Sequence, residues 1–225
     1  MDYETEEQQL EAIKKWWKEN SSMVVTGVAV GIASIFGWQF YQTQTIQHAE
    51  QASVLYEQVL MLSGNPQKMD SQIASANQLE ADFKDTPYAS LSALIIAKQQ
   101  LAAGQIEKAQ QQYRWVIENA NQTELKYLAK IRLSRLLLSN KQADEALNLL
   151  NETYPESFNE MVFELKGDVL SFQGNSDGAK AAYTKALTFS KNPNRWLQLK
   201  IDDIGELRDK SGADSKTQTG TEPSA

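Results

Sequence analysis

The sequence contains no cysteine, a single histidine, five prolines and eleven glycines among its 225 residues. Without cysteine the chain has no disulfide framework and no thiolate metal site, so its stability must come from packing. His48 has no second nitrogen or sulfur ligand beside it in the sequence, and we expect it at the surface. The few prolines and glycines, and the lack of sustained apolar-polar alternation, argue against a β architecture.

Basic residues are also few, since 22 Lys and Arg stand against 29 Asp and Glu and the net charge is −7. Nucleic-acid-binding proteins carry a basic patch for the phosphates, so we expect no nucleic-acid partner. The chain also lacks the glycine-rich, nucleophile and metalloprotease motifs of common enzyme classes. Acidic pairs such as Asp202 and Asp203 fit a solvated helix face better than paired-carboxylate catalysis. We therefore predict a protein that is not an enzyme, with no cofactor, metal or small-molecule substrate.

One long hydrophobic run is present, from Met23 to Tyr41, and it carries no formal charge over nineteen residues. As a helix this run would be about 28 Å long, close to the ~30 Å hydrocarbon thickness of a bilayer. Its few hydroxyl groups can bond to carbonyl groups of the same helix. We predict a transmembrane helix over residues 23–41, with the lipid bilayer as one partner.

The residues that flank this run predict its orientation. Lys14, Lys15 and Lys18 precede it, whereas no Lys or Arg follows before Lys68. Because basic residues near a span tend to stay in the cytoplasm, we expect the N-terminus there and the rest of the chain on the far side. A cleaved signal peptide is disfavoured, since the head is 22 residues long and the end of the run is bulky. The interpretation is an uncleaved signal anchor, single-pass and type II.

Small residues recur along one face of the predicted span. Gly27 and Gly31 form a G-x-x-x-G pair, and Ser34 continues the same face. Such faces let a second membrane helix approach closely, although glycine is also simply frequent in membrane helices. These three residues are the candidate helix-packing face.

The segments outside the span are less constrained by their sequence. Residues 1–22 are predicted to be a cytoplasmic tail, for which a short amphipathic helix on the membrane surface and an unstructured chain both remain open. Residues 42–62 are polar but rich in helix formers, so the membrane helix could continue into them. Residues 211–225 have no apolar content to offset the entropy of ordering, and we predict disorder there.

Residues 42–210 contain helix pairs that repeat. Three helix-turn-helix units are predicted at residues 88–119, 125–153 and 161–189. A small residue early in each second helix aligns at Ala109, Ala146 and Ala179, with spacings of 37 and 33 residues. These spacings bracket the tetratricopeptide period of about 34 residues. Four residues further on, the large residue that the repeat requires is Tyr113, Leu150 and Tyr183.

The third unit matches the repeat best. Phe163, Gly167 and Leu170 occupy positions of its W-x2-L-G-x2-Y string, and Lys166 departs from it where leucine is usual. Residues 194–209 form a last amphipathic helix that is expected to cap the stack. The predicted fold class is all-α: a single N-terminal transmembrane helix followed by a tetratricopeptide-like helical-repeat solenoid.

In such stacks the first helix of each unit lines a concave groove. In the first two units the groove-facing positions are mostly apolar: Leu91, Leu94, Lys98, Leu101, Leu128, Ile131, Arg135 and Leu138. In the third unit they are Met161, Glu164, Asp168 and Ser171. One interpretation is a groove that holds a partner's apolar segment, with Lys98 and Arg135 fixing its register. The other is that these residues pack against residues 42–62 or close a tight superhelix. Under the first, Leu94→Asp with Leu138→Asp should abolish partner capture in a folded domain.

Taken together, these features resemble a known family. The string Glu11 to Asn20 (EAIKKWWKEN), the exit Gly37, Trp38, Phe40 and Tyr41, and the degenerate repeats are similar to the ancillary subunit of the bacterial SecYEG translocon. The likeness covers nearly the whole chain except the tail after Lys210. It implies an inner-membrane protein of Gram-negative bacteria with a periplasmic repeat domain. The partners it implies are the SecYEG translocon, a membrane-anchored periplasmic chaperone of the prolyl-isomerase type and secreted client proteins, and it also implies a cytoplasmic effect on a stress response regulator.

Both lines of reasoning predict a tethered, non-catalytic interaction module. The first hypothesis is an adaptor associated with the Sec translocon, which helps pass secreted proteins to periplasmic chaperones through protein-protein interactions of its repeat domain. The alternative is a structural scaffold of another inner-membrane or envelope complex, with a regulatory role for the cytoplasmic tail. Crosslinking at Leu94 during secretion would separate the two.

Overall fold

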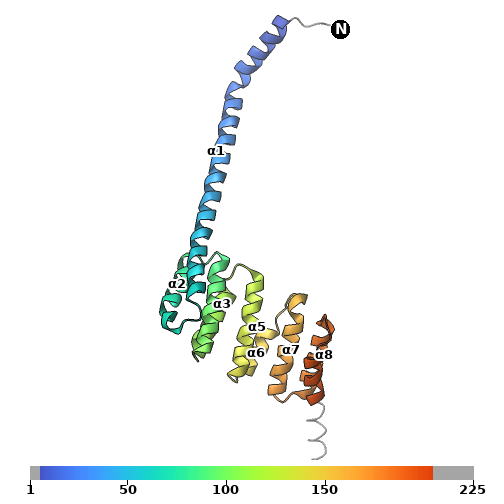
Figure 1. The fold of residues 1–225 in the computed structure, drawn as a ribbon. Helices are drawn as coiled ribbons and strands as arrows, with labels where there is room; N and C mark the ends of the chain where they lie inside the picture. Colours follow the sequence, from blue (N-terminus) through green and yellow to red (C-terminus); the bar gives the residue numbers. More distant parts are fainter. Residues whose placement is uncertain (1–5, 205–225) are drawn as a thin grey trace, which may run out of the picture. The chain divides into compact units, whose positions relative to one another are not determined.

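The computed structural model describes residues 6–204, and all regular elements within that range are helical. The predicted all-α fold is therefore confirmed, with helix following helix along the chain (Figure 1). The prediction of disorder for residues 211–225 lies outside the described residues, as does the end of the predicted capping helix.

The chain divides into two compact units, residues 1–51 and residues 52–225. The first described element, α1 (Glu6–Leu62), is a single helix that begins in the first unit and ends in the second. It contains the predicted span and runs on through residues 42–62 without a break, which the helix-forming composition of that segment made possible. The predicted boundaries at residues 22 and 41 have no counterpart in the backbone and stay predictions. Gly64 adopts the left-handed conformation (φ 85°) just after the helix ends.

The second compact unit, which begins at residue 52, consists mainly of short antiparallel helices in the order of the sequence (Figure 1). After the short turn η1 (Pro66–Lys68) come seven labelled helices: α2 (Met69–Asp82), α3 (Pro87–Ala102), α4 (Ile106–Asn119), α5 (Thr123–Ser139), α6 (Ala143–Leu150), α7 (Glu156–Phe172) and α8 (Ser176–Phe189). Residues 195–204 are also helical. The pairs α3 and α4, α5 and α6, and α7 and α8 are the three predicted units. The start of α7 lies five residues before the predicted Met161, and Pro155 precedes it as the N-cap residue with an extended backbone (ψ 150°).

The turn inside each unit has the same geometry. Gly104 (φ 72°), Lys141 (φ 62°) and Gly174 (φ 76°) each lie five residues before the aligned alanine and adopt the left-handed conformation. The following amide N–H donates to the carbonyl five residues earlier, at 2.8 to 2.9 Å in all three units. This closure satisfies carbonyl groups at the end of the first helix and turns the chain back. The middle unit builds the turn without glycine, at a cost in backbone energy.

Small side chains let the two helices of each unit approach. Ala109, Ala146 and Ala179 are each fully buried. In the third unit, a Cβ atom placed on Gly167 would come within 2.2 Å of a ring carbon of Tyr183, so that ring packs directly on the glycine. These contacts match the purpose expected of the aligned small and large residues. Residues 195–204 bury Leu197, Ile201 and Ile204 against α7 and α8, as a capping helix should.

Candidate functional site

The first candidate surface is the apolar part of α1. Within the described residues, one helix is long and apolar enough to cross a membrane, and none of its most apolar window is buried. Exposed valine, isoleucine and phenylalanine side chains dominate residues 23–41. The hydroxyls of Thr26 and Ser34 donate to the carbonyl oxygens of Ser22 and Val30 at 2.7 and 2.8 Å, so neither needs water. This segment therefore fits a single membrane span.

The predicted helix-packing face lies open on this segment. A Cβ atom on Gly27 or Gly31 would meet nothing within 4 Å, and Ser34 is exposed on the same helix. The small residues therefore serve no packing purpose inside the described chain. Their role in binding another membrane helix stays a prediction.

The second candidate surface is the groove formed by the first helices of the repeat units. The apolar side chains predicted to face the groove are more buried than the charged ones. Leu94 and Ile131 are 5 % and 1 % exposed and belong to the core, whereas Lys98 and Arg135 are exposed. The remaining apolar positions are half-buried: Leu91, Leu101, Leu128 and Leu138. Leu94 and Ile131 pack into a core shared by α3 to α7, in which no residue of 42–62 takes part, and the use of the groove stays a prediction.

The burial of Leu94 changes one expectation. An aspartate at this position would place a carboxylate in the core. Unless that carboxylate is paired, its burial lowers the stability of the fold by on the order of several kcal/mol. The double substitution Leu94→Asp with Leu138→Asp would therefore unfold the unit rather than only empty the groove. Crosslinking from Leu94 has the same weakness, and exposed positions of the groove are better probes.

A pocket of about 480 Å³ lies in the groove and is lined by residues of α3, α4 and α5. Three of the predicted groove residues line it, Lys98, Leu101 and Arg135. Its other lining residues were not predicted as site residues: Tyr113, Arg132, Leu136 and Ser139. Arg132 could have been found from the sequence, because it precedes Arg135 by one helical turn on the same face. Tyr113 was recognised only as a packing residue.

This pocket is strongly cationic. Lys98, Arg132 and Arg135 all line it, and none of them forms an ion pair with any residue that the structure describes. Burial raises the pKa of the Tyr113 hydroxyl, while the guanidinium groups of Arg132 and Arg135 act in the opposite direction. Positive charge is therefore concentrated here on a chain whose net charge is −7.

The equivalent region of the third unit is closed by the chain itself. Lys200, in the last described helix, donates to the carboxylates of Glu164 at 2.8 Å and Asp168 at 2.7 Å. The Tyr183 hydroxyl also donates to Asp168, at 2.8 Å. Burial alone would lower the pKa of Lys200, but the two carboxylates outweigh it and raise that pKa. The groove positions Glu164 and Asp168 are thus used for internal pairing, while Met161 and Ser171 stay exposed.

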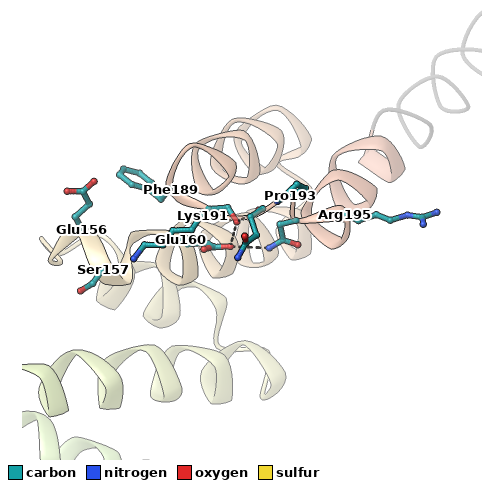
Figure 2. Close-up of a pocket in the computed structure, with 10 residues that line it drawn as sticks. Glu156, Ser157, Glu160, Phe189, Lys191, Pro193 and Arg195 are labelled. Carbon is teal, nitrogen blue, oxygen red and sulfur yellow. Dashed lines mark hydrogen bonds between the residues drawn. The ribbon is translucent and has the colours of Figure 1, made fainter.

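A larger pocket, of about 810 Å³, lies outside the predicted groove, where α7 faces the loop after α8 (Figure 2). Glu160 accepts hydrogen bonds from the Ser190 hydroxyl at 2.8 Å and the Asn194 amide at 3.1 Å. Figure 2 shows the Arg195 guanidinium pointing away from this carboxylate. Glu160 therefore anchors the loop that leads into the last helix. Throughout residues 6–204, no group of three or more His, Asp or Glu side chains is placed to hold a metal ion.

The stacked helix pairs and the groove define the class of this molecule, an α-helical repeat protein of the tetratricopeptide type with an apolar N-terminal helix. A family model described as a tetratricopeptide repeat-like domain matches residues 14–206. Curated relatives carry the name ancillary SecYEG translocon subunit. The protein from Escherichia coli is 29 % identical over 90 % of this chain and 98 % of its own length. Those from Haemophilus influenzae and Aggregatibacter actinomycetemcomitans are 29 % and 30 % identical, each over 80 % of this chain and 88 % of their own. The chain belongs to the tetratricopeptide repeat-like family and, within it, to the ancillary SecYEG translocon subunits.

Proposed function

We propose that this protein is a non-catalytic, membrane-tethered adaptor that associates with the Sec translocon and helps pass secreted proteins to periplasmic chaperones. The observation that carries the proposal is α1. This one helix contains a membrane-length apolar segment and continues to Leu62, within the compact unit that holds the repeats. The name shared by its relatives, ancillary SecYEG translocon subunit, supports the choice of partner. A tether of this kind holds a weakly binding groove at high effective concentration beside its target.

The proposed location is the inner membrane, with the N-terminus in the cytoplasm and the repeat units in the periplasm. The lysines before the span support this orientation. The chain has no cysteine, so single cysteines can report topology without a background. In spheroplasts, a membrane-impermeant maleimide should label Lys108→Cys but not Glu11→Cys until the membrane is lysed. The reverse pattern would overturn the orientation and the periplasmic role together.

The proposed partners are the SecYEG translocon, a membrane-anchored periplasmic chaperone of the prolyl-isomerase type, and secreted clients. Co-purification from membranes in a mild detergent tests the first two. For the clients, a photocrosslinker at Lys98 is suitable because that residue is exposed and lines the groove pocket. Adducts with many nascent chains during secretion support the adaptor.

A second candidate function is a structural scaffold of an envelope complex. The burial of Leu94 and Ile131 favours it, because it leaves little apolar surface in the groove for varied clients. A scaffold should give one stoichiometric adduct from Lys98, unchanged when secretion is blocked. The regulatory role of the cytoplasmic tail, residues 1–22, stays a prediction in either case.

A further inference from the structure

The groove pocket and the third repeat unit contain the same tyrosine in two different settings. Tyr113 and Tyr183 each lie four residues after an aligned buried alanine, Ala109 and Ala179. Both are nearly buried, at 4 % and 3 % exposed. In the repeat register they are the same residue, so the surroundings of one predict what the other requires.

In the third unit the tyrosine has a carboxylate partner. The Tyr183 hydroxyl donates to Asp168 at 2.8 Å, and Lys200 on the following helix balances the charge of that carboxylate at 2.7 Å. Asp168 lies eleven residues before the aligned Ala179. The hydroxyl, the carboxylate and the cation thus satisfy one another inside the chain.

In the first unit the carboxylate is missing. The residue eleven positions before Ala109 is Lys98, so a cation replaces the anion. The following helix, α5, supplies Arg132 and Arg135 beside Tyr113, which parallels the position of Lys200. Among the described residues, the Tyr113 hydroxyl has no hydrogen-bond partner and none of the three cations has an ion pair.

The pocket therefore has every component of the internal site except its anion. Charge complementarity decides the occupant, because three cations without ion pairs around the Tyr113 hydroxyl, which lines the pocket, favour carboxylates and disfavour other cations. Three positive charges exceed what one carboxylate neutralises, so more than one acidic side chain is required. Leu101 and Leu136 also line the pocket and suit an apolar residue next to the acids.

We propose that the pocket between α3 and α5 binds an acidic segment of a partner protein, whose Asp or Glu carboxylate takes the place that Asp168 occupies beside Tyr183. This inference rests on the proposed function of the repeat units as a binding module, and it names the chemistry of the partner. The carboxylate accepts from Tyr113 and from the guanidinium groups, and Lys98 pairs with a second acid.

Fluorescence anisotropy with the full chain in detergent micelles tests the proposal. The probe is a labelled peptide in which Asp and Glu alternate with Leu, blocked at both ends. We expect it to bind about tenfold or more tightly than its counterpart with Asn and Gln, and to weaken as salt is added. Arg135→Glu should weaken binding about tenfold, and Tyr113→Phe about threefold through loss of one hydrogen bond. Lys108→Glu is the matched control, since it makes the same charge change at an exposed site outside the pocket.

The sharpest variant is Lys98→Asp, which copies the third unit into the first. Its carboxylate should pair with Tyr113 and the arginines, so peptide binding is lost while the melting temperature is equal to or above that of the wild type. A loss caused by misfolding would instead lower the melting temperature. Retention of peptide binding by Lys98→Asp in a folded protein would overturn the proposal.

Three further results would also contradict it: equal binding of the acidic and amide peptides, equal weakening by Lys108→Glu and Arg135→Glu, or preference for a peptide whose only acid is its terminal carboxylate. Translocon co-purification of the same variants separates this inference from the proposed function. If the acidic and amide peptides bind equally well while the translocon still co-purifies, only the pocket assignment is overturned. If the translocon does not co-purify with the wild-type protein while the acidic peptide still binds, only the proposed function is overturned.

Discussion

The ring of Tyr183 lies directly on Gly167, so closely that a Cβ atom at residue 167 would be 2.2 Å from a ring carbon. The contact joins the two helices of the third unit and holds the Tyr183 hydroxyl beside Asp168. The close contact with the Tyr183 ring favours glycine at residue 167, whereas the helical backbone there suits any residue.

Gly167→Ala is expected to destabilise the protein by about 1–3 kcal/mol, because the added methyl group must push the tyrosine ring or separate α7 from α8. Chemical denaturation followed by circular dichroism measures the loss. The middle unit suggests the rescue, since it has Ser134 and Leu150 at the two equivalent positions. Adding Tyr183→Leu to Gly167→Ala should restore part of the stability. If the single variant is as stable as the wild type, the close packing is not a constraint.

A second prediction concerns Glu80 in α2, whose carboxylate is half-buried. One of its oxygens is fully buried without a hydrogen-bond partner among the described residues. Burial raises the pKa of Glu80 from 4.5 to about 7. Because the folded state holds the proton more tightly than the unfolded state, the stabilisation is fully present below about pH 4.5 and disappears as the pH rises through 7.

Glu80→Gln should remove this pH dependence and stabilise the protein above pH 7 by on the order of 1–2 kcal/mol, less than the full shift because the side chain is partly solvated. The measurement is the melting temperature of both proteins between about pH 5 and pH 8, a range that includes the raised pKa of about 7. Glu107→Gln, at an exposed position in the first turn of α4, is the control. Parallel profiles for wild type and Glu80→Gln would show that the carboxyl is not buried as described.

The turn of the middle unit supplies a third prediction. Lys141 adopts φ 62° where the other two units have glycine. Lys141→Gly should stabilise the protein by about 0.5–1 kcal/mol, because the left-handed conformation costs glycine little. The converse change, Gly174→Ala, should destabilise it by a similar amount. Denaturation midpoints test both, and shifts of the same sign in the two variants would contradict the argument.

Much of the fold followed from the sequence because the repeat has a fixed register. The alignment of Ala109, Ala146 and Ala179 placed the buried positions and the turns, and each of the three is fully buried. The pairing of each unit was predictable for the same reason, since adjacent helices joined by short turns must pack against one another.

The candidate site followed less well, because it depends on side chains from different units. Spacing alone put Lys98 and Arg135 in the groove, but not the depth of Leu94 and Ile131, which depends on how tightly the stack closes. Likewise, the pairing of Lys200 with Glu164 and Asp168 needs the last helix in place. Long charged side chains reach partners that periodicity does not specify.

The last prediction concerns the small-residue face of α1. Nothing within the described chain lies within 4 Å of a Cβ atom on Gly31, so Gly31→Leu should leave the fold of this protein unchanged. If Gly27, Gly31 and Ser34 pack against another membrane helix, leucine would hold that helix away and weaken the association by on the order of 1 kcal/mol. Translocon recovered by co-purification should then fall several-fold, with circular dichroism unaltered. Val25→Leu, an exposed position on another face of α1, is the control because it enlarges a side chain without blocking the glycines. Equal recovery with Gly31→Leu and Val25→Leu would mean that the glycines carry no interface, and that the tether acts only by placing the repeat units at the membrane.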